Sequence, residues 1–146
     1  MSTRREAREW AVQILFQWDF NSGELDRALK DFWSDRKSSA RERAFAESLA
    51  RGAIEQRESV DATIRKYADN WDIRRMGAVD RNVMRIAVYE MLYRRDIPPV
   101  VSINEAVDIA RDFSDDASAK FVNGILDRLR KDLDRPARTA VSEGSP

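Results

Sequence analysis

The middle of the chain contains the stretch Asp80-Arg81-Asn82-Val83-Met84-Arg85-Ile86-Ala87-Val88-Tyr89-Glu90, inside a segment (79–94) that predicts a buried helix. Its apolar residues surround most of a helical circumference, which is typical of a helix that other helices cover on every side. Pro98 and Pro99 end this segment and favour extended backbone before the next helix, which we expect to start at Ser102. The stretch therefore predicts a central helix around which the rest of the chain packs.

The remainder of the sequence also predicts helices. Apolar residues recur at three- and four-residue spacing and alternating runs are few, so we expect an all-α fold of about seven helices. A hydroxyl three residues before a carboxylate predicts helix starts after Thr3, Ser39 and Ser102. We expect the other helices at about 4–20, 24–33, 40–67 (continuous or restarted), 103–113 and 119–133. Gly124 lowers helix stability, so we expect close helix packing there.

A chain of 146 residues is long enough for one domain, or for two small subdomains that share a core. We expect a single domain over 1–135, made of an N-terminal helical subdomain at about 1–70 and a C-terminal one at about 71–135. The segment 71–76 is the expected junction, and Gly77 is suited to a turn. The small and polar residues at 136–146 predict a disordered tail.

Composition limits the possible functions. The 26 basic and 26 acidic residues cancel, so an RNA site would have to be a local patch. Histidine and cysteine are absent, and no phosphate-binding glycine motif is present, so the usual triads, thiol chemistry and zinc cages are unsupported. No segment approaches the ~20 uncharged apolar residues of a membrane span. We therefore expect a cytoplasmic protein without membrane association, and composition leaves open only catalysis by scattered Asp, Glu, Ser or Lys side chains.

Three arginines open the first predicted helix, at Arg4, Arg5 and Arg8. The start of a helix carries partial positive charge, so arginines there are electrostatically disfavoured, and a bound phosphate would account for them. The alternative is that Glu6 and Glu9 pair with them on a solvated face, and charge alone favours this alternative.

Phe16 lies nearly opposite the apolar stripe of its predicted helix, so it indicates either packing against the other subdomain or a contact with a partner protein. Asp80 begins the central helix, where a carboxylate is favourable whatever the function. Glu90 falls on an apolar helix face and raises an enzyme hypothesis. Pairing with an arginine or with backbone amides explains this carboxylate better, because one carboxylate is not a mechanism.

Four stretches occur in the order and spacing of a known family, between about residues 4 and 130. They are the central stretch above and Arg4-Arg5-Glu6-Ala7-Arg8, Val101-Ser102-Ile103-Asn104-Glu105-Ala106-Val107 and Lys120-Phe121-Val122-Asn123-Gly124-Ile125-Leu126-Asp127. In this the chain resembles the NusB family of bacterial transcription antitermination factors. The resemblance implies an all-α, NusB-like fold of two packed helical subdomains.

The resemblance also implies function and partners, for a protein that is not an enzyme and has no cofactor or metal. A protein of this kind binds the boxA element of nascent RNA and pairs with the tenth small-subunit ribosomal protein, called NusE in this role. The pair joins other Nus factors on RNA polymerase and supports ribosomal RNA synthesis. Some members form a homodimer that covers the RNA-binding face when RNA is absent.

Residue by residue, the resemblance places the RNA contacts at Arg4, Arg5 and Arg8, with Lys120 and Phe121 beside them. A lysine suits phosphate and an aromatic ring suits base stacking, although Phe121 is equally suited to the core.

The partner contacts implied by the resemblance are Phe16, Asp80 and Phe113. Ala117 departs from the family pattern, because an aspartate that affects partner binding occupies this position in a representative member.

Two alternatives remain open. One is a helical protein-interaction module without RNA function, and the other is the related helical domain that precedes a ribosomal RNA methyltransferase. The second is disfavoured because this chain has no room for a cofactor-binding sheet.

Overall fold

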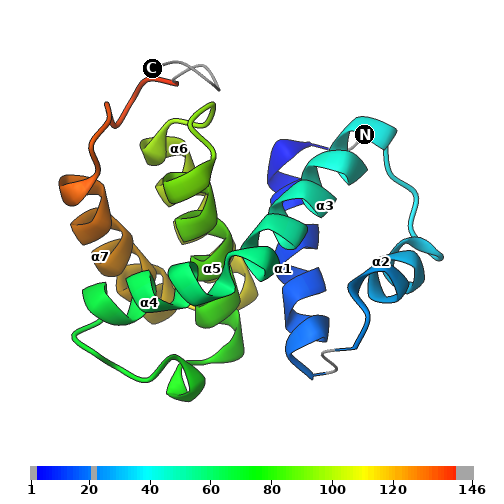
Figure 1. The fold of residues 1–146 in the computed structure, drawn as a ribbon, viewed down its shortest axis with the longest axis horizontal. Coiled ribbons are helices and arrows are strands. Elements are labelled where there is room, and N and C mark those ends of the chain that lie inside the picture. Colours follow the sequence, from blue (N-terminus) through cyan, green and yellow to red (C-terminus); the bar gives the residue numbers. More distant parts are fainter. Residues whose placement is uncertain (1–2, 21–22, 141–146) are drawn as a thin grey trace.

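The computed structural model describes residues 3–20 and 23–140, which form seven α-helices and one short 3₁₀ helix (Figure 1). The elements are α1 (Arg4–Phe20), α2 (Leu25–Trp33), α3 (Ala40–Glu55), α4 (Arg57–Tyr67), η1 (Ile73–Arg75), α5 (Ala78–Tyr93), α6 (Pro99–Phe113) and α7 (Asp116–Asp132). No strand occurs among these residues, so the predicted all-α class is confirmed. None of the described helices is both long and apolar enough to cross a membrane.

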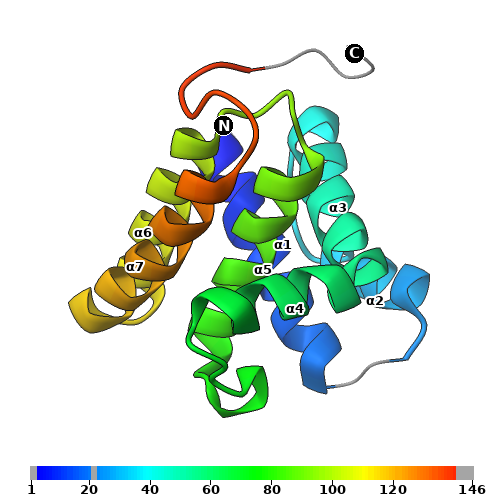
Figure 2. The ribbon, with the colours of Figure 1, turned by 60° about the vertical axis from the view of Figure 1, so that its left-hand side comes forward.

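Helix α5 is the centre of the molecule, as its sequence predicts. It packs against α1, α3, α4, α6 and α7, and Figure 2 shows it enclosed by these helices. Val83, Met84, Val88 and Met91 are at most 2% exposed. The buried apolar residues form one hydrophobic core, because helices that are distant in sequence all pack on α5.

Two of the three predicted helix starts are confirmed. The Glu6 amide donates to the Thr3 hydroxyl at 3.0 Å, and the Glu42 amide donates to that of Ser39 at 3.2 Å. The start predicted at Ser102 is wrong. Helix α6 begins three residues earlier, at Pro99, because proline needs no hydrogen-bond acceptor for an amide in the first helical turn.

The turns differ in detail from the prediction. The 40–67 segment restarts, with α3 ending and α4 beginning around Gln56. After α4 the chain reverses at Asp69 and Asn70, whose φ angles of 54° and 64° are left-handed, whereas Gly77 has an ordinary φ of −55°. Helix α7 begins at Asp116, earlier than the expected residue 119, because the carboxylate of Asp115 caps the helix by accepting a hydrogen bond from the Ser118 amide at 2.8 Å.

The close packing expected at Gly124 is wrong. A Cβ atom built there meets no atom within 4 Å, and the residue is exposed. Close approach occurs instead at Gly52, where a Cβ atom would lie 2.1 Å from the Tyr89 ring. Gly52 lets α3 lie against α5 at this point.

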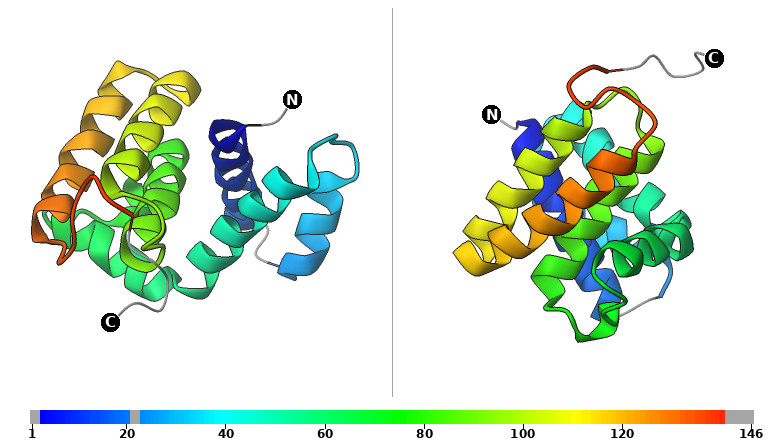
Figure 3. Two further views of the ribbon diagram at one scale, coloured as in Figure 1. Left: turned by 90° about the horizontal axis from the view of Figure 1, so that it is seen from above. Right: turned by 90° about the vertical axis from the view of Figure 1, so that its left-hand side faces the viewer.

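The helices form two groups. In Figures 1 and 3, α1, α2 and α3 lie on one side and α4, α6 and α7 on the other, with α5 between. Since α4 packs against α5 and α7, we propose a boundary between subdomains near Gln56 rather than near residue 70. Of the expected tail, residues 136–140 are described, and the Val100 amide donates to the Ala137 carbonyl at 3.0 Å. Residues 141–146 lie outside the described part.

Candidate nucleic-acid and partner interface

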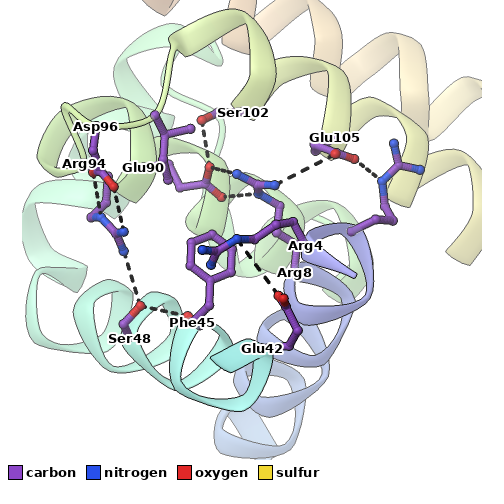
Figure 4. A network of polar contacts seen from close by, with 12 residues as sticks. Arg4, Arg8, Glu42, Phe45, Ser48, Glu90, Arg94, Asp96, Ser102 and Glu105 are labelled. Carbon is purple, nitrogen blue, oxygen red and sulfur yellow. Dashed lines mark hydrogen bonds and ion pairs between the residues drawn. The ribbon is translucent and has the colours of Figure 1, made fainter. Parts of the chain in front are cut away.

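Arg8 and Glu90 form a buried ion pair between α1 and α5. Arg8 Nε and Nη2 each donate to a different Glu90 carboxylate oxygen at 2.9 Å, and Ser102 Oγ of α6 donates to Oε1 at 2.8 Å (Figure 4). The side chains of Arg8 and Glu90 are only 6% and 1% exposed. Glu90 is therefore satisfied structurally, as expected, and the guanidinium of Arg8 is held inside the protein and not presented to solvent.

Arg4 lies at the surface, one turn before Arg8. Its guanidinium carbon is 3.9 Å from the centroid of the Phe45 ring of α3, and its side chain is 45% exposed. Glu42 is the nearby acid, with 4.0 Å between Arg4 Nε and Oε2. That separation is at the limit of an ion pair, so Arg4 is positioned mainly by the aromatic ring and stays accessible.

Arg5 faces α6. It donates to Glu105 through Nε and to Asp108 through Nη2, the latter at 2.8 Å. Although burial lowers its pKa, the contacts with these two carboxylates raise the pKa of Arg5 above its usual value, so it remains charged. For the neighbouring acid Glu9 the effect of burial has the opposite sign, because burial raises the pKa of Glu9 despite the nearby charge of Arg5. The arginines thus pair with acids of other helices, not with Glu6 and Glu9 as the charge pattern alone favoured.

The start of α1 adds backbone donors to these side chains. Thr3 caps the Glu6 amide, and the first intrahelical bond runs from the Ala7 amide to the Thr3 carbonyl. The amides of Arg4 and Arg5 precede the first helical bond, so they have no partner within the helix. The side chains of Arg4 and Arg5, which are 45% and 36% exposed, therefore lie beside two amides without a partner in their own helix, an arrangement that favours an anion.

The other two predicted RNA contacts belong to α7, which packs on α6, α5 and α4. Lys120 is exposed, whereas Phe121 is half-buried and its ring centroid is 6.0 Å from that of Trp71. Phe121 is thus both packed against the core and accessible at its edge. In the structure, the Phe121 ring lies against Trp71, whereas the Arg5 side chain lies against Glu105 and Asp108 of α6.

The last turns of α1 carry an exposed aromatic pair. Phe16 is 37% and Phe20 is 78% exposed, and their ring centroids are 5.1 Å apart. Val12, in contrast, is 4% exposed, so it supplies the packing between the helix groups that was one explanation for this face. Asp80 lies in the first turn of α5 as expected.

Asp19 ties this end of α1 to the start of α5. Its carboxylate accepts hydrogen bonds from Asn82 at 3.0 Å, Arg81 at 3.1 Å and Arg85 at 2.9 Å. Burial alone would raise its pKa, but the hydrogen bond from Asn82 and the charges of Arg85 and Arg81 together lower the pKa of Asp19 below its usual range. This network brings Phe16 and Asp80, on α1 and α5, into the same region.

Phe113, the third predicted partner residue, is 36% exposed and lies at the end of α6. Ala117 is exposed in the first turn of α7, close in sequence to Phe113. Because these residues belong to other elements than Phe16 and Asp80, their place in a partner surface rests on the resemblance alone.

Sequence reasoning missed the residues that support the arginines, namely Glu42, Phe45, Ser102 and Glu105. The available signal was the position of Arg8, which shares a helical face with Val12 and Leu15 at spacings of four and seven. An arginine on a buried face requires a buried acid, and Glu90 was the one acid already placed on an apolar face.

Taken together, the fold and the site define a class: an all-helical binding protein with accessible arginines at one helix start and an exposed aromatic pair at the other end of that helix. The comparisons with known proteins agree with this class. The chain belongs to the NusB family, whose model matches residues 5–131.

Relatives and solved structures match nearly the whole chain. The transcription antitermination protein NusB of Methylacidiphilum infernorum is 43% identical over 94% of this chain and 96% of its own length. That of Trichlorobacter lovleyi is 47% identical over 88% of this chain and 91% of its own. The T. maritima NusB structure has a TM-score of 0.82 at 36% identity, covering 93% of this chain and 94% of that one.

A further similar structure is of a complex. It is described as antitermination factors NusB and NusE in complex with double-stranded RNA, and the matched chain has a TM-score of 0.81 at 27% identity. The match covers 89% of this chain and 97% of that one.

Proposed function

We propose that this protein is a transcription antitermination factor that binds boxA RNA together with the tenth small-subunit ribosomal protein, NusE. In this function the pair acts with other Nus factors on RNA polymerase and supports ribosomal RNA synthesis in the cytoplasm. The protein binds and positions its partners without catalysing a reaction. The observation that carries this proposal is family membership over residues 5–131, combined with similarity to a NusB of a NusB–NusE–RNA complex.

Arg4 and Arg5 are the proposed phosphate contacts. Their side chains are 45% and 36% exposed, whereas the acids Glu42 and Glu105 beside them are only 12% and 20% exposed. The arginines are therefore the accessible members of these pairs, and an RNA phosphate can approach them from the solvent side. Lys120 and Phe121 of α7 are the proposed second group of contacts, for phosphate and base respectively.

Arg8 has a different proposed role from Arg4 and Arg5. Its guanidinium is paired with Glu90, which also accepts a hydrogen bond from Ser102. Arg8 therefore holds α1 against α5 and α6 and fixes the direction of the start of α1. We propose that Arg8 is a positioning residue for the RNA site and does not itself contact a phosphate.

The partner surface that we propose combines Phe16, Asp80 and Phe113. An exposed aromatic ring next to charged groups is typical of the centre of a protein interface. Asp19 connects α1 and α5, the helices that carry Phe16 and Asp80. Because Ala117 stands where a representative family member has an aspartate, the proposed partner surface carries one negative charge less than the family pattern.

Each member of such a pair supplies only part of the RNA site. The net charge of this chain is zero, and Arg4, Arg5 and Lys120 are few cations for a nucleic-acid site. A second basic surface from NusE extends the patch, so the pair binds boxA more tightly than either protein alone. A homodimer of the free protein that covers Arg4 and Arg5 would weaken RNA binding further.

The proposal is tested by replacing Arg4→Gln and Arg5→Gln together and measuring boxA affinity against salt concentration. Two lost phosphate contacts lower the slope of log affinity against log salt by about 1.4, since each contact on single-stranded nucleic acid contributes about 0.7. Arg8 is left intact, because its loss would disturb folding as well as binding.

The matched control is Arg27→Gln with Arg65→Gln, which removes the same charge from exposed positions on α2 and α4. The control should keep the wild-type slope. If the Arg4 and Arg5 variant also keeps it while NusE still binds, the alternative of a helical interaction module without RNA function is correct.

A further inference from the structure

The segment after α7 (133–138) crosses the connection between α5 and α6 (94–98), and arginines gather at this crossing. Arg135 holds the two segments together by donating to two carbonyls of the connection, at 3.4 Å and 3.1 Å. The crossing lies at the same end of the molecule as the start of α1 (Figure 2). We propose that it extends the RNA site, with Arg95 and Arg138 as binding residues for phosphates of the RNA that flanks boxA. The inference rests on the proposed RNA-binding function and extends it.

Positive charge exceeds negative charge at the crossing. The two segments that meet there contain four arginines and two acids. Arg95 and Arg138 are exposed, and neither side chain forms a hydrogen bond or an ion pair among the described residues. Both guanidinium groups are therefore accessible to an anion from solvent.

Arg135 shows that the charges of the crossing are not balanced within the described part of the chain. It forms no ion pair there, and its Nε is buried without a hydrogen-bond partner. Burial and the nearby charge of Arg95 lower the pKa of Arg135, and Asp96 has a smaller opposite effect. The Asp96 carboxylate already accepts two hydrogen bonds of 3.0 Å from Arg94. A phosphate beside Arg95 would offset this repulsion between like charges.

The crossing is connected to the start of α1 through Phe45. The guanidinium carbon of Arg4 is 3.9 Å from the centroid of the Phe45 ring, and that of Arg94 is 5.6 Å from the same centroid. Figure 4 shows both guanidinium groups beside this ring. Because Arg95 follows Arg94 in the chain, the crossing begins next to the proposed phosphate contact Arg4. This continuity favours RNA over an acidic peptide as the ligand.

The proposed contacts at the crossing are with the RNA backbone and not with bases. The planar fork of an arginine side chain matches phosphate oxygens, and contacts to phosphate carry no sequence information. The flanking RNA should therefore bind whatever its sequence, while boxA supplies the selectivity.

The test compares boxA RNA with boxA RNA extended by about six uridines at the 5′ or the 3′ end, each bound to the full-length protein together with NusE. We expect one of the two extensions to steepen the slope of log affinity against log salt by about 1.4, since two phosphate contacts add about 0.7 each. Between about 50 and 200 mM salt, the extended RNA should then lose about sevenfold more affinity than boxA alone. Replacing Arg95→Gln and Arg138→Gln together should remove this difference and leave the binding of unextended boxA unchanged.

The matched control is again Arg27→Gln with Arg65→Gln, which removes two exposed charges from α2 and α4. It should retain the steeper slope of the extended RNA. Arg135 is left intact, because its hydrogen bonds hold the segment after α7 in place. Circular dichroism verifies that each variant is folded.

The outcomes separate this inference from the proposed function. If neither extension steepens the wild-type slope, or if the Arg95 and Arg138 variant keeps the steeper slope, while boxA still binds selectively, the extended site is refuted and the RNA function stands. If the wild type does not distinguish boxA from a scrambled RNA, the proposed function fails, and the same extensions on the scrambled RNA decide the inference. Weaker NusE binding in the variant with an unchanged effect of the extension would show a protein site and overturn the inference.

Discussion

Replacing Arg8 by methionine would leave the carboxylate of Glu90 buried and without its main counter-charge. Both side chains are almost fully buried, and the pair is joined by two hydrogen bonds of 2.9 Å. Removing one partner of such a pair costs about 3–5 kcal/mol. A domain of this size has a total stability of about 5–15 kcal/mol, so the loss should be a large fraction of the whole.

Urea denaturation followed by circular dichroism measures this loss directly. Arg4→Met makes the same chemical change at an exposed arginine of the same helix and should cost below about 1 kcal/mol. The double variant Arg8→Met with Glu90→Leu should recover most of the stability, because apolar residues of similar volume replace a buried pair at little cost. Ser102 can then bond to the Pro98 carbonyl one turn earlier.

Two results would refute this reasoning. One is an Arg8→Met protein within about 1 kcal/mol of the wild type, which would mean that Glu90 is not buried against this arginine. The other is a double variant as unstable as the sum of both single variants, which would mean that the two side chains act independently.

Three further predictions concern other parts of the molecule. Burial raises the pKa of Asp19, but the surrounding amide and guanidinium groups lower it further, so the net shift is downward. The contribution of Asp19 to stability is therefore present above about pH 4 and is lost at lower pH. Asp19→Asn should flatten the dependence of unfolding free energy on pH in that range. Gly52→Ala should destabilise the protein by about 1–3 kcal/mol because the added Cβ meets the Tyr89 ring. Gly124→Ala should stabilise it by about 0.5–1 kcal/mol, because alanine favours a helix and nothing obstructs the Cβ there. Equal effects of the two changes in urea denaturation would contradict the packing described. Phe16→Ala should weaken NusE binding at least about tenfold in calorimetry with an unchanged unfolding midpoint, and unchanged affinity would remove Phe16 from the partner surface.

Much of the fold could be predicted from local patterns in the sequence. The apolar circumference of α5 predicted its central place, and the hydroxyl–carboxylate spacing at Thr3 and Ser39 predicted two helix starts. These features succeed because the residues involved lie within one helix, where spacing determines geometry.

Features that depend on distant residues were not predictable in this way. Ser102 has the spacing of a helix cap, but its hydroxyl bonds to Glu90 of another helix. Gly52 and Gly124 are both helical glycines, and only the neighbouring helix distinguishes them.

The candidate site shows the same division. Arg4, Arg5 and Arg8 could be found from their position at a helix start, but sequence spacing does not tell that Arg8 turns inward to Glu90. Phe45 and Glu105, which position the exposed arginines, come from α3 and α6 and had no signal of their own.

The measurement that tests the central claim most directly is the affinity of the full-length protein for boxA RNA and for a scrambled RNA, each with and without NusE. The account predicts selective boxA binding that strengthens when NusE is present, because the two proteins together form one RNA site. Equal affinity for the two RNAs in the presence of NusE, or equal boxA affinity with and without it, would contradict the account.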